Sequence, residues 1–134
     1  MMKSYFEMVR EFHETYGLVI SEEPMTSKEI TDNVELWQLR TNLHTEEFRE
    51  LGEAMLTGNI VDIADAIGDS IVVLCGTAVS YGIPLDEVFA EIHRSNMSKL
   101  GEDGKPIVRE DGKILKGPNF SPPDLKSIIY DSKD

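Results

Sequence analysis

Apolar residues recur at helical spacing along four stretches of this chain. Gly17, Gly58 and Gly82 are placed to end the first three stretches. Asn59 is a suitable cap for the third, and Pro84 is suited to the first turn of the fourth. The predicted helices span residues 2–16, 27–56, 60–81 and 84–98. Long helices joined by short links predict an all-α fold with a four-helix-bundle core.

The pattern changes after residue 100. Asp-Gly-Lys occurs at residues 103–105 and again at 111–113, beside short β-prone segments. Three prolines follow within residues 118–123 and disfavour helix. We therefore expect residues 101–134 to form a hairpin-like, Pro/Gly-rich tail laid on the bundle, with residues 1–134 making one domain.

Glutamates continue an apolar stripe on the second predicted helix. Leu36, Leu39 and Leu43 lie on one face, and the same spacing leads to Glu47 and Glu50. These two carboxylates are one helical turn apart, so they can be directed at one point. The pattern predicts acidic groups on the inward side of this helix.

The third predicted helix also has acidic residues within an apolar pattern. Asp62, Asp65 and Asp69 share one face and are the only charged residues between positions 58 and 84. Their apolar surroundings indicate that they face the core, where a carboxylate must be paired, protonated or bound to metal. Arg49 is the only cation nearby in the sequence. Carboxylate oxygens without cysteine ligands favour a hard cation, Mg²⁺, with Mn²⁺ as a substitute.

The composition of the chain bears on its partners and its location in the cell. The formal net charge of −12 argues against nucleic acid as a partner, because nucleic-acid binders carry basic surfaces. The single cysteine, Cys75, lies in an apolar run and is expected to be a buried thiol. We find no signal-peptide pattern and no run long enough to span a membrane, so a cytoplasmic location is expected.

Three strings carry a resemblance to a known family. The first is Glu-Glu-x-x-Glu at residues 46–50, followed by the acidic third helix. The second is Ile-His-Arg-Ser-Asn-Met-Ser-Lys at 92–99, and the third is Lys-Ile-Leu-Lys-Gly-Pro-Asn at 113–119. Over residues 5–125 the chain resembles the all-α nucleotide pyrophosphohydrolases, which include MazG and phosphoribosyl-ATP pyrophosphatase. It is most similar to their compact bacterial and phage members.

The resemblance implies magnesium ligands on both central helices. Glu47, Glu50 and Asp69 match the family's motifs directly. Ala66 stands where the family has its fourth ligand, a glutamate. Asp65, one turn before Asp69, is the expected substitute, and Asp62 is the alternative.

The resemblance also implies substrate contacts and an assembly. Arg94, Asn96, Lys99 and Lys116 would bind the nucleotide, and Glu46 or Glu50 would act on the attacking water. The expected reaction converts a nucleoside triphosphate to a monophosphate and pyrophosphate, in a homodimer or homotetramer. The alternative is a non-catalytic nucleotide-binding protein, or a helical interaction protein with an acidic face between subunits.

Overall fold

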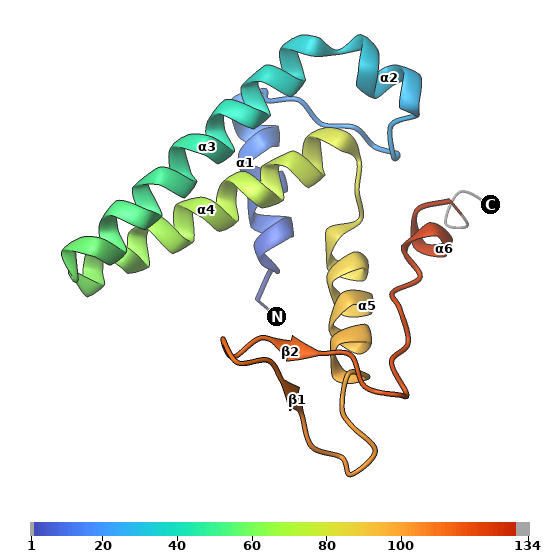
Figure 1. Cartoon of the computed structure of the whole chain (residues 1–134). Coiled ribbons are helices and arrows are strands. Elements are labelled where there is room, and N and C mark those ends of the chain that lie inside the picture. Colours follow the sequence, from blue (N-terminus) through green and yellow to red (C-terminus); the bar gives the residue numbers. More distant parts are fainter. Residues whose placement is uncertain (1, 131–134) are drawn as a thin grey trace. The chain divides into compact units, whose positions relative to one another are not determined.

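The computed structural model describes residues 2–130, so residue 1 and the last four residues of the predicted tail lie outside the described part. The chain is mostly helical, with one small sheet (Figure 1). It divides into two compact units, Met1–Leu85 and Asp86–Asp134, which are described separately. The all-α class is confirmed; the single domain and the four-helix core stay predictions. Among residues 2–130, no helix is long and apolar enough to cross a membrane.

The first unit contains four helices. They are α1 (Tyr5–Tyr16), α2 (Ser27–Asp32), α3 (Val34–Thr57) and α4 (Ile60–Tyr81). Figure 1 shows α3 and α4 as a long antiparallel pair, with α1 packed against α4. Gly58 ends α3 in a left-handed conformation, and the Asn59 side chain then caps α4 by accepting from the Val61 and Asp62 amides. The boundaries predicted for residues 60–81 are confirmed.

The helix predicted over residues 27–56 is interrupted at Asn33. This residue leaves helical geometry, with φ −105° and ψ 71°, and its side chain accepts a hydrogen bond from the Leu36 amide. It therefore acts as the N-cap of α3, and the six residues before it form the separate helix α2. The prediction of one continuous helix was wrong, because an internal asparagine was not considered as a cap.

The core of the first unit lies between α1 and α4. Val9, Cys75 and Val79 are buried in contact with one another, and Phe6 and Ile71 are among the partly buried residues around them. The expected burial of the Cys75 thiol is confirmed. The inward face of α3 also includes charged and polar side chains, among them Arg40 and Glu47.

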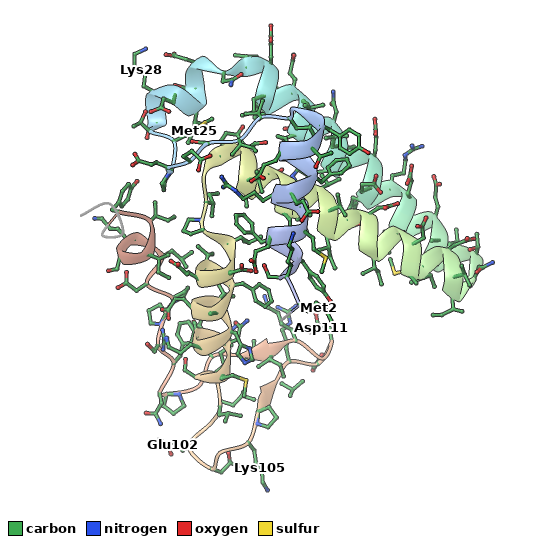
Figure 2. All side chains as sticks on the ribbon, turned by 180° about the vertical axis from the view of Figure 1, so that it is seen from behind. Met2, Met25, Lys28, Glu102, Lys105 and Asp111 are labelled. Carbon is green, nitrogen blue, oxygen red and sulfur yellow. The ribbon has the colours of Figure 1, made fainter. Side chains whose placement is uncertain are left out.

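The second unit consists of α5 (Leu85–Met97), a two-stranded hairpin and α6 (Leu125–Tyr130). Strands β1 (Ile107–Val108) and β2 (Ile114–Leu115) pair antiparallel, with Ile107 opposite Leu115. A short hairpin is thus present within the predicted tail, while the packing of the tail on the bundle stays a prediction. Helix α6 was not predicted. Within this unit the chain after β2 returns along α5 (Figure 2), where Glu91, Arg94 and Ser98 hydrogen-bond to it.

Candidate functional site

Glu47 lies in the contact between α3 and α4. The side chains of α3 that are least exposed fall at one helical spacing, which confirms Glu47 on the inward face of this helix and places Glu50 and Leu39 outside it. The inward positions are Leu36, Arg40, Leu43, His44, Glu47, Leu51 and Ala54. A carboxylate thus occupies a position that an apolar residue would ordinarily fill.

One oxygen of Glu47 has no partner. Its Oε2 atom is buried without a hydrogen bond. Burial raises the pKa of the Glu47 carboxyl above its ordinary value, and the negative charges of Glu50, Asp69 and Glu46 raise it further. An unpaired carboxylate with acidic neighbours is destabilising unless a proton or a cation is supplied.

These electrostatic effects show which predicted acidic residues lie near one another. Glu47 and Glu50 come from α3 and Asp69 from α4, so the structure brings together the three residues that the resemblance assigned as metal ligands. The charge of Asp65 is not among those that raise the pKa of Glu47. Arg49 forms its ion pair with Glu53 instead, at 3.9 Å.

The aspartates of α4 are less buried than their sequence context indicated. Asp62, Asp65 and Asp69 are all exposed, while Ala66, between Asp65 and Asp69, is buried. The expectation that the three aspartates face the core was therefore wrong. Among residues 2–130, no three His, Cys, Asp or Glu side chains converge closely enough to form a metal site as they stand.

A buried polar network extends from the acidic group along the same face of α3. Arg40 is only 7% exposed, and its guanidinium donates to the Val73 carbonyl at 2.7 Å and to the Thr77 hydroxyl at 3.0 Å. His44 Nε2 lies 2.6 Å from the same hydroxyl. Sequence reasoning missed this network, although Arg40 gave the same signal as Glu47, a charged residue at an inward position.

A largely apolar hollow lies beside Glu47. Its volume is about 570 Å³, and residues of both central helices line it. Its lining residues are His44, Thr45, Glu47, Phe48, Arg49, Leu51, Ser70 and Leu74. The carboxylate of Glu47 thus borders an open apolar surface as well as the acidic group.

The predicted substrate contacts all belong to the second unit. Asn96 is exposed on α5, and Lys99 follows the end of that helix. Lys116 lies after β2, with its ammonium 4.8 Å from the centre of the Phe120 ring. The guanidinium of Arg94 is paired with Glu91, with Nε 2.6 Å from Oε1.

Charge is divided unevenly between the two units. Residues 1–85 contain fifteen Asp and Glu against five Lys and Arg, whereas residues 86–134 contain ten against eight. The first unit is therefore strongly acidic, whereas the second is close to neutral.

These features define an all-α protein with an acidic helix pair as its candidate site. Residues 9–96 match the model of the phosphoribosyl-ATP pyrophosphohydrolase family. The chain belongs to this family of pyrophosphohydrolases.

Two individual proteins are also similar. An uncharacterised protein of Acanthamoeba polyphaga mimivirus is 30% identical over 101 residues, which are 75% of this chain and 38% of that protein. The chain thus spans well under half of this curated relative. A crystal structure from Exiguobacterium sp. 255-15, named as a candidate NTP pyrophosphohydrolase, is 22% identical with a TM-score of 0.49, covering 99% of this chain and 98% of that one.

Proposed function

We propose that this protein hydrolyses the α–β phosphoanhydride of a nucleoside triphosphate, giving a nucleoside monophosphate and pyrophosphate. Family membership supports the reaction class. The observation that carries the proposal is the buried, unpartnered oxygen of Glu47 among Glu46, Glu50 and Asp69. A buried carboxylate without a partner, surrounded by other negative charges, lowers the stability of the folded protein. A bound functional cation would offset this loss.

The donor set fits a hard divalent cation. Glu47, Glu50 and Asp69 offer only carboxylate oxygens, with Asp65 one turn before Asp69 as the proposed fourth ligand, and these are the donors that Mg²⁺ and Mn²⁺ prefer. Because the carboxylates are close but not converged, we expect binding to draw them together. When bound, the cation would neutralise phosphate charge and make the α-phosphorus more electrophilic.

The chain's own residues supply the remaining chemistry. Glu46 or Glu50 accepts a proton from a water molecule while the oxygen of that water forms a bond to the α-phosphorus. The bond between the α-phosphorus and the oxygen that bridges it to the β-phosphorus breaks. Pyrophosphate then leaves with the electron pair of the broken bond. Asn96, Lys99 and Lys116 bind the phosphates and offset their charge. Arg94 was predicted to join them, and its role is taken up below.

Glu50→Gln is the direct test of this assignment. The change removes a proton acceptor and a metal ligand from an exposed position, so turnover should fall by at least about a hundredfold while the fold is kept. Glu53→Gln, nearly one turn further along α3 and paired only with Arg49, is the control and should stay within about twofold of wild type. Full activity in Glu50→Gln would refute the catalytic role.

We further propose that the protein acts as a homodimer or homotetramer. Large apolar side chains of α3 and α4 are exposed in the single chain, among them Phe48 at 80% and Leu56 at 89%. Such a concentration of exposed apolar surface is typical of a subunit interface. The hollow beside Glu47 belongs to this surface, so a second copy would also remove water from around the carboxylate.

A second candidate is a non-catalytic nucleotide-binding or helical interaction protein. It is favoured by one observation, that the described carboxylates do not converge into a ready-made metal site. In a helical interaction protein the acidic residues would lie between subunits or on a binding face, and Mg²⁺ would leave thermal stability unchanged. The metal response therefore separates the enzyme from an interaction protein, and turnover separates it from a non-catalytic nucleotide-binding protein.

A further inference from the structure

One face of α5 is covered by the segment that follows the hairpin. Glu91, Arg94 and Ser98 lie at successive turns of this helix, and each hydrogen-bonds to residues 121–124. The contacts join positions 23 to 33 residues apart in the sequence. They therefore determine where the returning segment lies on the helix.

Glu91 is the centre of this contact. Its carboxylate accepts from Arg94 Nε at 2.6 Å, from Arg94 Nη2 at 2.9 Å and from the Asp124 amide at 2.7 Å. Arg94 Nη2 also donates to the Pro122 carbonyl at 3.2 Å. The Glu91 side chain is 16% exposed, far less than an ordinary surface glutamate, because the segment covers it.

Two further contacts fix the same segment. Ser98 Oγ accepts from the Ser121 amide at 2.8 Å. Gly117 lies so close to the end of α5 that a Cβ atom there would be 2.0 Å from the Leu100 carbonyl oxygen and 2.7 Å from that of Lys99. The backbone at Lys116 and Gly117 therefore passes directly beside Lys99, which places two of the proposed phosphate contacts in neighbouring positions.

We propose that Arg94 is a positioning residue: with Glu91 it forms a clasp that holds residues 116–124 on α5 and so keeps Lys116 beside Lys99 for phosphate binding. This role rests on the proposed function. It differs from the direct phosphate contact expected from sequence, because two nitrogens of the guanidinium are already engaged by Glu91 and Pro122. A phosphate could take over these two nitrogens only by displacing both partners, so a direct contact that leaves the pair intact would be limited to Nη1.

Glu91→Gln distinguishes a clasp from a phosphate ligand. The substitution keeps the shape of the side chain and leaves Arg94 in place, but it removes the charge that holds the guanidinium. If Arg94 positions the segment, nucleotide binding weakens in Glu91→Gln. If Arg94 contacts phosphate, its release from Glu91 makes nucleotide binding tighter. Arg94→Lys gives the complementary comparison, since lysine keeps the charge and loses the bidentate geometry.

The control is another arginine–carboxylate pair of the same unit. Arg109 donates through Nε and Nη2 to Asp111, two residues away, in the turn of the hairpin. This pair has similar geometry but joins no distant segments. Arg109→Gln should therefore leave both the segment and the substrate affinity as in wild type.

Two readouts are needed on the full chain. Hydrogen exchange of residues 117–130 without ligand reports on the clasp alone. The dissociation constant of an α,β-imido nucleoside triphosphate with Mg²⁺, and KM and kcat for the parent triphosphate, report on positioning. We expect Glu91→Gln and Arg94→Lys each to speed exchange in this segment and to raise the dissociation constant and KM about tenfold, with kcat changed less.

Each other outcome overturns part of the proposal. Unchanged exchange in both variants would refute the clasp. Faster exchange with unchanged affinity would refute the positioning role. Tighter binding by Glu91→Gln together with weaker binding by Arg94→Lys would overturn it in favour of a direct contact between Arg94 and phosphate. A wild-type chain that neither binds nor hydrolyses the nucleotides would refute the proposed function together with the positioning role, while the exchange result would still decide the clasp.

Discussion

At the scale of single residues, Glu47 should lower the stability of the metal-free protein. Its pKa is raised in the folded state, so the folded carboxyl binds a proton more readily than the unfolded one. Stability without metal should therefore fall as pH rises through the ordinary glutamate range and beyond. Glu47→Gln removes this effect, and thermal unfolding at pH 7 should show a higher melting temperature than wild type in chelator.

The same substitution should remove the response to metal. Mg²⁺ should stabilise wild type by mass action on the folded state and should leave Glu47→Gln nearly unchanged. Glu53→Gln, at an exposed position on the same helix, is the matched control and should keep the response. A Glu47→Gln protein with the full Mg²⁺ response would show that the cation is held elsewhere.

Gly76 gives a second prediction at this scale. A Cβ atom there would lie 2.5 Å from Arg40 Nη2 and 3.0 Å from His13 Nε2. Because hydrogen bonds to α4 hold the Arg40 guanidinium, it cannot move away freely. Gly76→Ala should cost about 1–3 kcal/mol of unfolding free energy, measured by urea denaturation.

Gly68 is the matched control on the same helix. It has no atom within 4 Å of a Cβ position, so Gly68→Ala should stabilise by up to about 1 kcal/mol through helix propensity alone. Equal effects of the two alanines would show that Arg40 does not require the space at Gly76.

Sequence reasoning found the acidic residues but not their surroundings. Periodicity placed Glu47 inward correctly, because the α3 stripe continues through it. It misjudged the exposed aspartates of α4, since periodicity does not show how much of a helix surface its neighbours cover. The Arg40 network was missed because its partners, Val73 and Thr77, lie on another helix more than thirty residues away.

At the scale of elements, the two asparagine caps show what sequence does and does not reveal. Asn59 was identified because Gly58 precedes it, whereas Asn33 follows Asp32 in a stretch without a glycine or proline. The short helix α6 was missed for a related reason, because the prolines before it were taken to exclude helix from the whole tail. Helix ends marked by a glycine were therefore predicted closely, whereas the internal cap at Asn33 and the late helix α6 were not.

The cap of α3 leads to a prediction at this scale. The Asn33 side chain accepts from the Leu36 amide at 3.1 Å, so Asn33→Ala should lower stability by about 1 kcal/mol. Asn42→Ala, at an exposed position within α3, should be neutral or slightly stabilising because alanine favours helix. The comparison uses urea denaturation of both variants, and a smaller loss in Asn33→Ala than in Asn42→Ala would contradict the cap.

At the scale of the whole molecule, the exposed apolar surface of α3 and α4 predicts an assembly. Phe48→Glu places a charge beside the hollow, which should disrupt a subunit interface there. Light scattering should show a dimer or tetramer for wild type and a smaller species for the variant. Tyr5→Glu, on α1 and similarly exposed, is the control. A wild-type monomer at micromolar concentration would contradict the proposed assembly.

Sequence alone predicted the helical class and most helix boundaries, because these depend on local patterns. Helix periodicity reports on each helix separately, so the sequence did not reveal the division into units at Leu85 and Asp86. The covering of α5 by the returning segment was also hidden, because Glu91 and Asp124 are 33 residues apart. Contacts between residues that are far apart in the sequence could be found only in the structure.

The most direct test of the central claim is product analysis with purified protein and a panel of canonical and modified nucleoside triphosphates. Reactions would contain Mg²⁺, Mn²⁺ or chelator, with Glu50→Gln in parallel. We predict release of a nucleoside monophosphate and pyrophosphate in equal amounts, dependent on metal and lost in Glu50→Gln. Release of inorganic phosphate with a diphosphate, or no release by a folded wild-type protein, would contradict the proposed reaction.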